Sequence, residues 1–395
     1  MSIHQSNHLS KAERIQLGSY YTPPNLVEIV FDFIAPFIEK NKQNAVLFDN
    51  AAGYGAFISR NLDFDYRVSD FDTNVINFLK DKLPKDKVFY SNSLINVNRK
   101  NYDIDEDKFL IQVGNPPYND ITSEFKNGLK GKNECDADLF DRDLGVSFLK
   151  SYNKLKANIV CILHPLSYLI KSANFERLKE FKDNYRLIKG LVFSSSMFSG
   201  TGSMKFPIVV SLYERNNRGM DFDYISNFEF DVLNNREKFV LSNYETTDGY
   251  INKYPPRKND SKISPINTYY YTFRDFNSLK KNASFINAPH YNGIVVTVEN
   301  LYKYAYLYAL KTFFNNENNW LYGNLSPLIN RKKLEFSKPM YVLYALQSNP
   351  VLKNLNPSDI SEIRKYYFLD NKNFGSEKEI ESKIRDEIKN LAKPA

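Results

Sequence analysis

The feature that most constrains the fold is the alternation of short apolar runs with helical patterns through the first half of this 395-residue chain. Such alternation is typical of a largely parallel β-sheet covered by helices. Helical stretches are predicted at 75–83 and 146–155. The apolar runs predict seven strands, at 46–48, 66–69, 87–90, 109–113, 158–163, 187–193 and 207–213. The first half is therefore expected to be a doubly wound α/β domain.

The alternation of apolar runs and helical patterns stops after Glu214, and the rest of the chain shows no clear βαβ pattern. Residues 253–260 are polar and Pro-rich and predict a linker or exposed loop. A helix is expected at 299–314. A last helix begins with a capping box of Ser376 and Glu379 and should pack on its own domain; its apolar face would comprise Ile380, Ile384, Ile388 and Leu391. We expect an N-terminal arm at 1–16, a first domain at 17–235 and a second, α+β domain at 236–395.

Composition places few limits on function. Hydrophobic residues make up 42% and charged residues 25%, which is ordinary for a globular protein. No run of eighteen apolar residues and no signal-peptide pattern is present, so a cytoplasmic location without membrane contact is expected. The two cysteines, Cys135 and Cys161, and the four histidines have no metal-ligand spacing, so no metal site is predicted.

The net charge of +7 is concentrated toward the C-terminus. From residue 251 onward the chain carries about 22 Lys and Arg against about 13 Asp and Glu. Basic residues between 253 and 338 are interleaved with aromatic ones, including the run Tyr269-Tyr270-Tyr271. This pattern suits a nucleic-acid surface. A solvated basic face over an aromatic core is the equal alternative.

The sequence Asn115-Pro116-Pro117-Tyr118, called the tetrad below, follows the apolar run 109–113 and Gly114. It predicts a buried strand that ends in a turn, and ligands bind at such strand ends in open α/β sheets. The Asn115 side chain and the Pro116 carbonyl are hydrogen-bond acceptors, and the Tyr118 ring can lie against a flat base. Both prolines would keep these groups rigid. An isolated Asn-Pro pair would indicate only a turn.

The segment Asp49–Gly55, called the glycine turn below, follows the first predicted strand. Gly53 and Gly55 allow the backbone to turn tightly beside a ligand. Asp70 ends the second strand, where a carboxylate accepts both ribose hydroxyls in nucleotide-binding folds. Asp72 suits the start of a helix. The alternative is that both aspartates are helix caps.

Together these segments resemble gamma-class adenine-N6 DNA methyltransferases, in the motif order X, I, II, III, IV, V, VI, VIII. The tetrad resembles motif IV of amino-methyltransferases. The glycine turn resembles motif I, with Asn50 where the family usually has proline. Asn92 stands where motif III usually carries aspartate, and Tyr21-Thr22-Pro23 resembles motif X, although Thr22 before two prolines also suits a helix start. Residues 138–140 resemble motif V, residues 162–169 motif VI, and Phe198 the aromatic of motif VIII, with Phe206 as its rival.

The resemblance implies a Rossmann-like seven-stranded methyltransferase sheet followed by a target-recognition domain. It implies S-adenosylmethionine as cofactor, bound by Tyr21, Thr22, Pro23, Asp49, Ala51, Gly53, Gly55, Asp70 and Asn92. The tetrad would bind the amine of a flipped-out adenine, stacked between Tyr118 and Phe198. Double-stranded DNA would be the partner of a monomer, with a restriction endonuclease encoded separately. Candidate DNA contacts are Lys253, Arg257, Lys258, Arg274, Arg331, Lys332 and Lys333.

Two other functions remain open at this point. The tetrad also suits a methyltransferase acting on RNA or on a protein glutamine. The departures at Asn50 and Asn92 also suit a catalytically silent subunit that binds DNA to provide specificity or regulation. A fused nuclease is disfavoured, because the chain is short and shows no nuclease cluster of carboxylates and lysine.

Overall fold

The computed structural model describes residues 22–58, 63–118, 134–198, 206–246, 265–271, 284–290, 293–313, 321–322 and 326–390. The chain forms two compact units, Met1–Val240 and Leu241–Ala395. The boundary expected between 235 and 236 falls inside strand β9 (Asn235–Phe239). This strand pairs with β8 (Phe230–Val232) in the sheet of the first unit.

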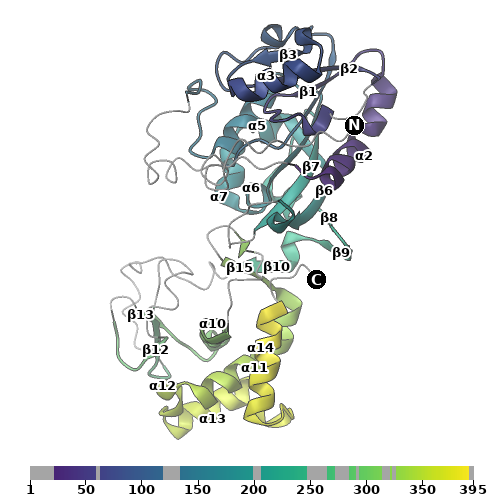
Figure 1. Cartoon of the computed structure of the whole chain (residues 1–395). Helices are drawn as coiled ribbons and strands as arrows, with labels where there is room; N and C mark the ends of the chain where they lie inside the picture. The colour runs from purple at the N-terminus through teal and green to yellow at the C-terminus, as the bar shows by residue number, and fades with distance from the viewer. Residues whose placement is uncertain are drawn as a thin grey trace. The chain divides into compact units, whose positions relative to one another are not determined.

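The first unit is built around a nine-stranded sheet of order β3-β2-β1-β4-β5-β7-β6-β8-β9 (Figure 1). All seven expected strands are present: β1 (Ala45–Asp49), β2 (Asp65–Asp70), β3 (Val88–Tyr90), β4 (Phe109–Gly114), β5 (Ile159–Pro165), β6 (Tyr185–Ser194) and β7 (Pro207–Arg215). The expected count of seven was too low by two. The additional strands β8 and β9 are short and partly polar, so their sequences lack the apolar runs that marked the others.

The strand directions match the expected methyltransferase-like arrangement. Strands β1 to β5 are mutually parallel where they pair. Strand β7 runs antiparallel between β5 and β6. The fold is therefore a Rossmann-like methyltransferase sheet. Because β1, β2 and β4 are parallel, Asp49, Asp70 and Gly114 end their strands at the same edge of the sheet.

Helices cover both faces of this sheet (Figure 1). Helix α2 (Pro24–Asn41) buries Leu26, Val30 and Ile34 against apolar residues of β1, β4, β5 and β7. Helix α3 (Thr73–Lys82) packs on β2 and β3. Among its described residues, the first unit also contains the helices α5 (Leu144–Lys154), α6 (Ser167–Ile170), α7 (Ser172–Phe175), α8 (Glu180–Asn184) and α9 (Phe222–Ser226). Its 3-10 turns are η1 (Ala56–Ile58), η2 (Lys85–Lys87), η3 (Arg99–Tyr102), η4 (Glu176–Leu178) and η5 (Ser195–Met197).

The second unit is α+β. One small sheet has the order β10-β15-β14, formed by Tyr244–Thr246, Ser326–Asn330 and Leu321–Tyr322. The other has the order β12-β11-β13, formed by Phe285–Ile286, Tyr269–Tyr271 and Gly293–Val295. The helices are α10 (Leu301–Phe313), α11 (Arg331–Ser348), α12 (Pro350–Lys353), α13 (Pro357–Tyr366) and α14 (Glu377–Asn390), with 3-10 turns η6 (Leu241–Asn243) and η10 (Leu369–Asn371).

The capping box and the packing of the last helix are confirmed. The Ser376 amide and hydroxyl both donate to Glu379 Oε2, at 2.5 and 2.9 Å. Ile380, Ile384 and Ile388 are buried in the core of their own unit, while Leu391 lies outside the described residues. None of the helices described is both long enough and apolar enough to cross a membrane.

Candidate active site

The glycine turn adopts a conformation that depends on its glycines. Gly53 and Gly55 have φ values of +50° and +75°, in the left-handed region that side chains disfavour. A Cβ on Gly55 would lie 3.0 Å from Ile58 Cγ1 and 3.1 Å from Leu79 Cδ2, so the position is also sterically closed. Ala52 and Tyr54 pack against α3. The turn is thus a fixed backbone loop at the carboxyl end of β1.

Asp70 connects the glycine turn to the end of β2. Its carboxylate accepts hydrogen bonds from the Gly53 amide at 2.9 Å and the Asp72 amide at 3.0 Å. Burial raises the pKa of Asp70 despite these bonds. The helix-cap alternative holds for Asp72, which caps α3 by accepting from the Asn74 amide at 2.8 Å. Asp70 instead holds the turn in place.

Asp49 links the glycine turn to the strand that carries the tetrad. Its Oδ1 accepts from the Ala51 amide at 3.2 Å, and it lies 3.3 Å from where a Cβ on Gly114 would be. The side chain is almost fully buried, and this burial raises the pKa of Asp49 to about 8. The structure therefore places the start of the glycine turn directly beside the residue that precedes the tetrad.

Other expected cofactor residues have local structural tasks. Asn92 Oδ1 accepts from the Leu94 amide at 3.0 Å, and Asn92 Nδ2 donates to the Glu134 carbonyl at 2.9 Å. Thr22 is buried, and the Pro23 carbonyl accepts the first amides of α2. The helix-start interpretation of this segment is thus confirmed. Tyr21 lies outside the described residues.

The tetrad lies at the carboxyl end of β4, as expected. Pro116 is buried, whereas Asn115, Pro117 and Tyr118 are half-buried. The Tyr118 hydroxyl donates to Asn115 Oδ1 and lies 3.2 Å from the Leu163 carbonyl of the adjacent strand β5. The tetrad is therefore tied across two strand ends, with the proposed amine acceptor already hydrogen-bonded.

The two aromatic candidates for base stacking differ in exposure. Phe198 is only 2% exposed and packs beside Phe193, with ring centroids 6.0 Å apart. Phe206 is half-buried, and its backbone is held by the buried Ser195, which accepts from the Phe206 amide at 3.0 Å. The loop 199–205 between them lies outside the described residues. In this structure Phe206 presents more ring surface than Phe198.

A buried polar group that the sequence did not reveal lies behind the tetrad. His164 follows Leu163 in β5, and its Nε2 lies 2.7 Å from the Tyr213 hydroxyl and 2.9 Å from Ser211 Oγ. The Tyr168 ring stacks on it at 5.3 Å. Burial lowers the pKa of His164 to about 4. The only signal in the sequence was a histidine directly after the predicted strand 158–163 and four residues before a tyrosine.

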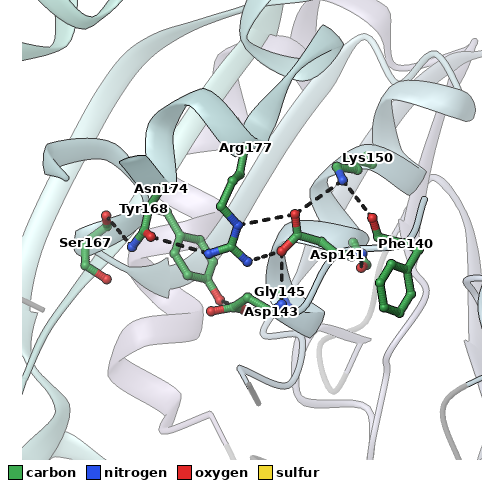
Figure 2. Close-up of polar contacts among 10 residues, drawn as sticks. Phe140, Asp141, Asp143, Gly145, Lys150, Ser167, Tyr168, Asn174 and Arg177 are labelled. Carbon is green, nitrogen blue, oxygen red and sulfur yellow. Dashed lines mark hydrogen bonds and ion pairs between the residues drawn. The ribbon is translucent and has the colours of Figure 1, made fainter. Parts of the chain in front are cut away.

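The start of α5 is fixed by ion pairs, as Figure 2 shows. Arg177 and Lys150 both contact the Asp141 carboxylate. Asp143 caps α5 through the Gly145 amide at 3.1 Å and accepts from the Tyr168 hydroxyl. A Cβ on Gly145 would lie 2.5 Å from that hydroxyl. Burial raises the pKa of Asp143 to about 6.

The segment that resembles motif V, residues 138–140, leads into this cluster. Asp138 is exposed and paired with Lys154 at 2.8 Å, Leu139 is buried, and Phe140 is exposed. The same stretch of chain contacts the loop after β3, because the Asp136 amide donates to the Leu94 carbonyl at 2.8 Å. It is therefore held at both ends.

In the second unit, three of the expected DNA contacts form the first turn of α11. Arg331, Lys332 and Lys333 are all exposed, and Arg331 Nε donates to the Tyr244 carbonyl at 3.2 Å. Phe336, one turn further along, is 83% exposed, with Lys372 Nζ 5.9 Å from its ring centroid. The remaining candidates, Lys253, Arg257, Lys258 and Arg274, lie outside the described residues.

The aromatic-core interpretation is correct for part of the second unit. Tyr269 and Tyr270 are buried, and the ring of Tyr270 stacks on that of Tyr304 with centroids 4.9 Å apart. These rings are therefore unavailable to a nucleic acid. Within the described ranges, no group of three or more His, Cys, Asp and Glu side chains is placed to hold a metal ion.

No protein-family model and no curated protein matches the chain. Among solved structures it is similar to the M protein of the type I restriction enzyme EcoKI, at 14% identity over 57% of this chain and 52% of that one (TM-score 0.39). A Listeria monocytogenes protein described as a class I S-adenosylmethionine-dependent methyltransferase has 15% identity, with 52% and 64% covered (TM-score 0.38).

A third similar structure is the 16S rRNA methyltransferase of T. thermophilus in complex with AdoMet and guanosine. Its identity is 15%, with 50% of this chain and 44% of that chain covered and a TM-score of 0.29. The chain thus spans less than two thirds of each of these three proteins.

Proposed function

We propose that this protein is an S-adenosylmethionine-dependent methyltransferase that modifies the N6 amine of a flipped-out adenine in double-stranded DNA. The observation that carries the proposal is the meeting of the glycine turn and the tetrad at neighbouring strand ends. Strands β1 and β4 are paired, and Asp49 lies against Gly114. A methyl donor on the turn and an amine acceptor at the tetrad would then be adjacent.

The residues of the glycine turn fit this cofactor. Gly53 and Gly55 allow a ligand to approach the backbone closely, and the Asp70 carboxylate beside them suits the ribose hydroxyls. Asp49 and Ala51 would line the same turn, with Thr22, Pro23, Tyr21 and Asn92 completing the site. When bound, the cofactor supplies an electrophilic methyl group on a positively charged sulfur.

On the target side, the tetrad would orient a weakly nucleophilic amine. Asn115 Oδ1 and the Pro116 carbonyl would accept its two protons, which turns the nitrogen lone pair toward the methyl group. The Tyr118 hydroxyl now donates to Asn115, so an entering amine would replace that bond. Tyr118 would stack on one face of the base, and Phe198 or Phe206 on the other.

The second unit would bind the duplex. Three cations at the N-terminal end of α11 oppose the helix dipole, so helix stability does not account for them. Phosphate binding does account for them. Arg331, Lys332 and Lys333, with the exposed Phe336, therefore form the described part of the proposed DNA surface. A restriction endonuclease encoded separately would be the functional partner.

The resemblance of Tyr21-Thr22-Pro23 to motif X, together with the basic C-terminal region, favours DNA over the alternative substrates, which are RNA and a protein glutamine. The test is to supply tritiated S-adenosylmethionine with duplex DNA, with total RNA and with a protein extract, and to digest each product. We expect label in N6-methyladenine from DNA. Label only in RNA or protein would refute the DNA assignment, and a chain that binds no cofactor at millimolar concentration in calorimetry would favour the silent subunit.

Replacing Asn115 tests methyl transfer separately from the integrity of the folded cofactor site. We expect Asn115→Ala to lower methyl transfer by about 10³-fold, the loss typical for removal of one preorganised polar group at a reacting centre. Calorimetry should show cofactor affinity within about threefold of wild type, because the tetrad lies outside the glycine turn. Asn101→Ala, an exposed asparagine in η3, is the matched control and should be fully active.

A further inference from the structure

Asn50, which stands where the resembled pattern has proline, is the centre of a buried hydrogen-bond network. It is 2% exposed. Its carbonyl accepts from Ser93 Oγ at 2.5 Å, and Ser93 Oγ lies 3.4 Å from Ser69 Oγ. The Ser69 carbonyl accepts from the Ala52 amide at 3.0 Å. The backbone of the glycine turn is thus tied to β2 and to the loop after β3.

The side chain of Asn50 connects the turn to a third element, strand β4. Gln112 Nε2 donates to Asn50 Oδ1 at 3.1 Å across 62 residues of sequence. Gln112 is fully buried and pairs in register with Phe48 of β1 and Val160 of β5. A polar side chain between apolar neighbours in the middle of a sheet costs free energy unless its hydrogen bonds are satisfied.

The amide pair is only half satisfied. Asn50 Nδ2 and Gln112 Oε1 are buried and have no hydrogen-bond partner among the residues that the structure describes. An apolar side chain at 112 would avoid this cost, so packing alone does not explain glutamine there. Gln112 instead provides a hydrogen bond to Asn50, the residue that follows Asp49.

We propose that Gln112 is a positioning residue for cofactor binding, which acts by holding Asn50 and thereby the glycine turn. Proline would fix the backbone at position 50 through its ring. This chain fixes the same position through hydrogen bonds from Gln112 and Ser93. The inference rests on the proposed function, since it assigns part of the affinity for the methyl donor to the bond between Gln112 and Asn50.

This arrangement makes positions 50 and 112 interdependent, which a double-mutant cycle measures. Asn50→Pro alone removes the side-chain acceptor of Gln112, and Gln112→Met alone leaves the Asn50 side chain without its donor. We expect each single variant to raise the dissociation constant for S-adenosylmethionine by about tenfold, the effect of one unpaired buried amide. The double variant should return to within about threefold of wild type.

Two further measurements distinguish a role of Gln112 in positioning the glycine turn from a role in stability alone. The KM for cofactor should rise in the single variants, whereas kcat at saturating cofactor should stay within about twofold. Gln347→Met is the matched control, because Gln347 in the second unit also has a buried Oε1 without a partner in the described part of the chain. This control should leave the cofactor dissociation constant unchanged.

The outcomes are distinct. If the single variants unfold at lower temperature but bind cofactor like wild type, the pair is merely structural and the inference is overturned. Additive losses in the double variant overturn it as well. A wild-type chain that binds no S-adenosylmethionine overturns the proposed function and this inference together, whereas wild-type binding with uncoupled variants overturns this inference alone.

Discussion

The glycine turn and the tetrad lie at neighbouring strand ends but are held in different ways. The turn is held by buried polar groups from three other segments: Asp70, Ser93 and Gln112. The tetrad is held mainly by its own prolines and by the Tyr118 hydroxyl, which bonds within the tetrad to Asn115. The turn is therefore rigid before any ligand arrives, whereas the tetrad makes a bond that its ligand must replace.

This difference suggests a division of work between the two sites. A preorganised turn loses little conformational entropy on binding, which favours affinity. In the tetrad, the Asn115 side-chain oxygen stays hydrogen-bonded to the Tyr118 hydroxyl until the amine enters. Variants in the turn should change cofactor affinity, and variants in the tetrad should change turnover. The following predictions test this separation.

The largest effect on cofactor affinity is expected at Asp70. Asp70→Ala removes two hydrogen bonds to a charged acceptor, each worth about 1.5–3 kcal/mol. We expect cofactor affinity to fall by about 100-fold in calorimetry. Asp72→Ala is the matched control: it removes the cap of α3, at about 1 kcal/mol of stability, and should leave affinity within about threefold. Equal losses of affinity in both variants would contradict a special role for Asp70.

Two variants at Tyr118 should distinguish the role of the ring from that of the hydroxyl. Tyr118→Ala removes a stacking surface worth roughly 1–3 kcal/mol per base, so we expect about a 30-fold loss in kcat/KM for DNA. Tyr118→Phe keeps the ring and frees Asn115, and should retain activity within about threefold. Steady-state kinetics with a methylatable duplex measure both. A Phe variant as impaired as the Ala variant would show that the hydroxyl, and not stacking, matters.

Because His164 is buried behind the tetrad, its protonation should lower the stability of the folded protein in acid. Its folded-state pKa of about 4 lies below the ordinary 6.5, so the unfolded chain binds the proton first as pH falls. Stability is therefore lost between about pH 6.5 and pH 4, by about 2 kcal/mol at pH 5. Urea unfolding at pH 5 and 7.5 should show this loss in wild type. His164→Gln should show a pH difference smaller by that amount; an unchanged difference would contradict the assignment.

The smallest effect is expected at Asp49 and concerns pH. With a folded pKa raised to about 8, the carboxyl is largely uncharged at neutral pH, and a cationic ligand favours its ionised form. Affinity for S-adenosylmethionine should rise about tenfold from pH 6 to pH 8. S-adenosylhomocysteine, which lacks the sulfonium charge, should show a weaker rise, and Asp49→Asn should remove the difference. Identical pH profiles for both ligands in wild type would contradict the expectation that a cationic ligand favours ionised Asp49.

The strands of the first unit could be predicted because each buried strand is marked in the sequence by an apolar stretch. Buried strands such as 109–113 and 158–163 are predominantly apolar, and the turns after them contain glycine or proline. The strands β8 and β9 could not be predicted this way. The short helices α6 to α8 were missed because four or five residues show no helical period.

Single residues of the candidate site could be predicted from the sequence, whereas the pairs that they form could not. Asp70 lies beside Gly53, at the ends of the two paired strands β1 and β2. The partner of Asn50 is Gln112, and nothing in the sequence links residues so far apart. The burial of Phe198 was likewise invisible, because an aromatic beside a glycine-containing loop suits a binding face and a core equally.

The contact between Gly145 and Tyr168 has a consequence for variation at position 145. The Tyr168 ring cannot retreat, because His164 stacks on it and Asp143 accepts from its hydroxyl. Even a methyl group at 145 would therefore separate the hydroxyl from Asp143. In a saturation library screened for folded protein, alanine should be as scarce as tryptophan at this codon, and only a second change that shortens the Tyr168 side chain should restore tolerance.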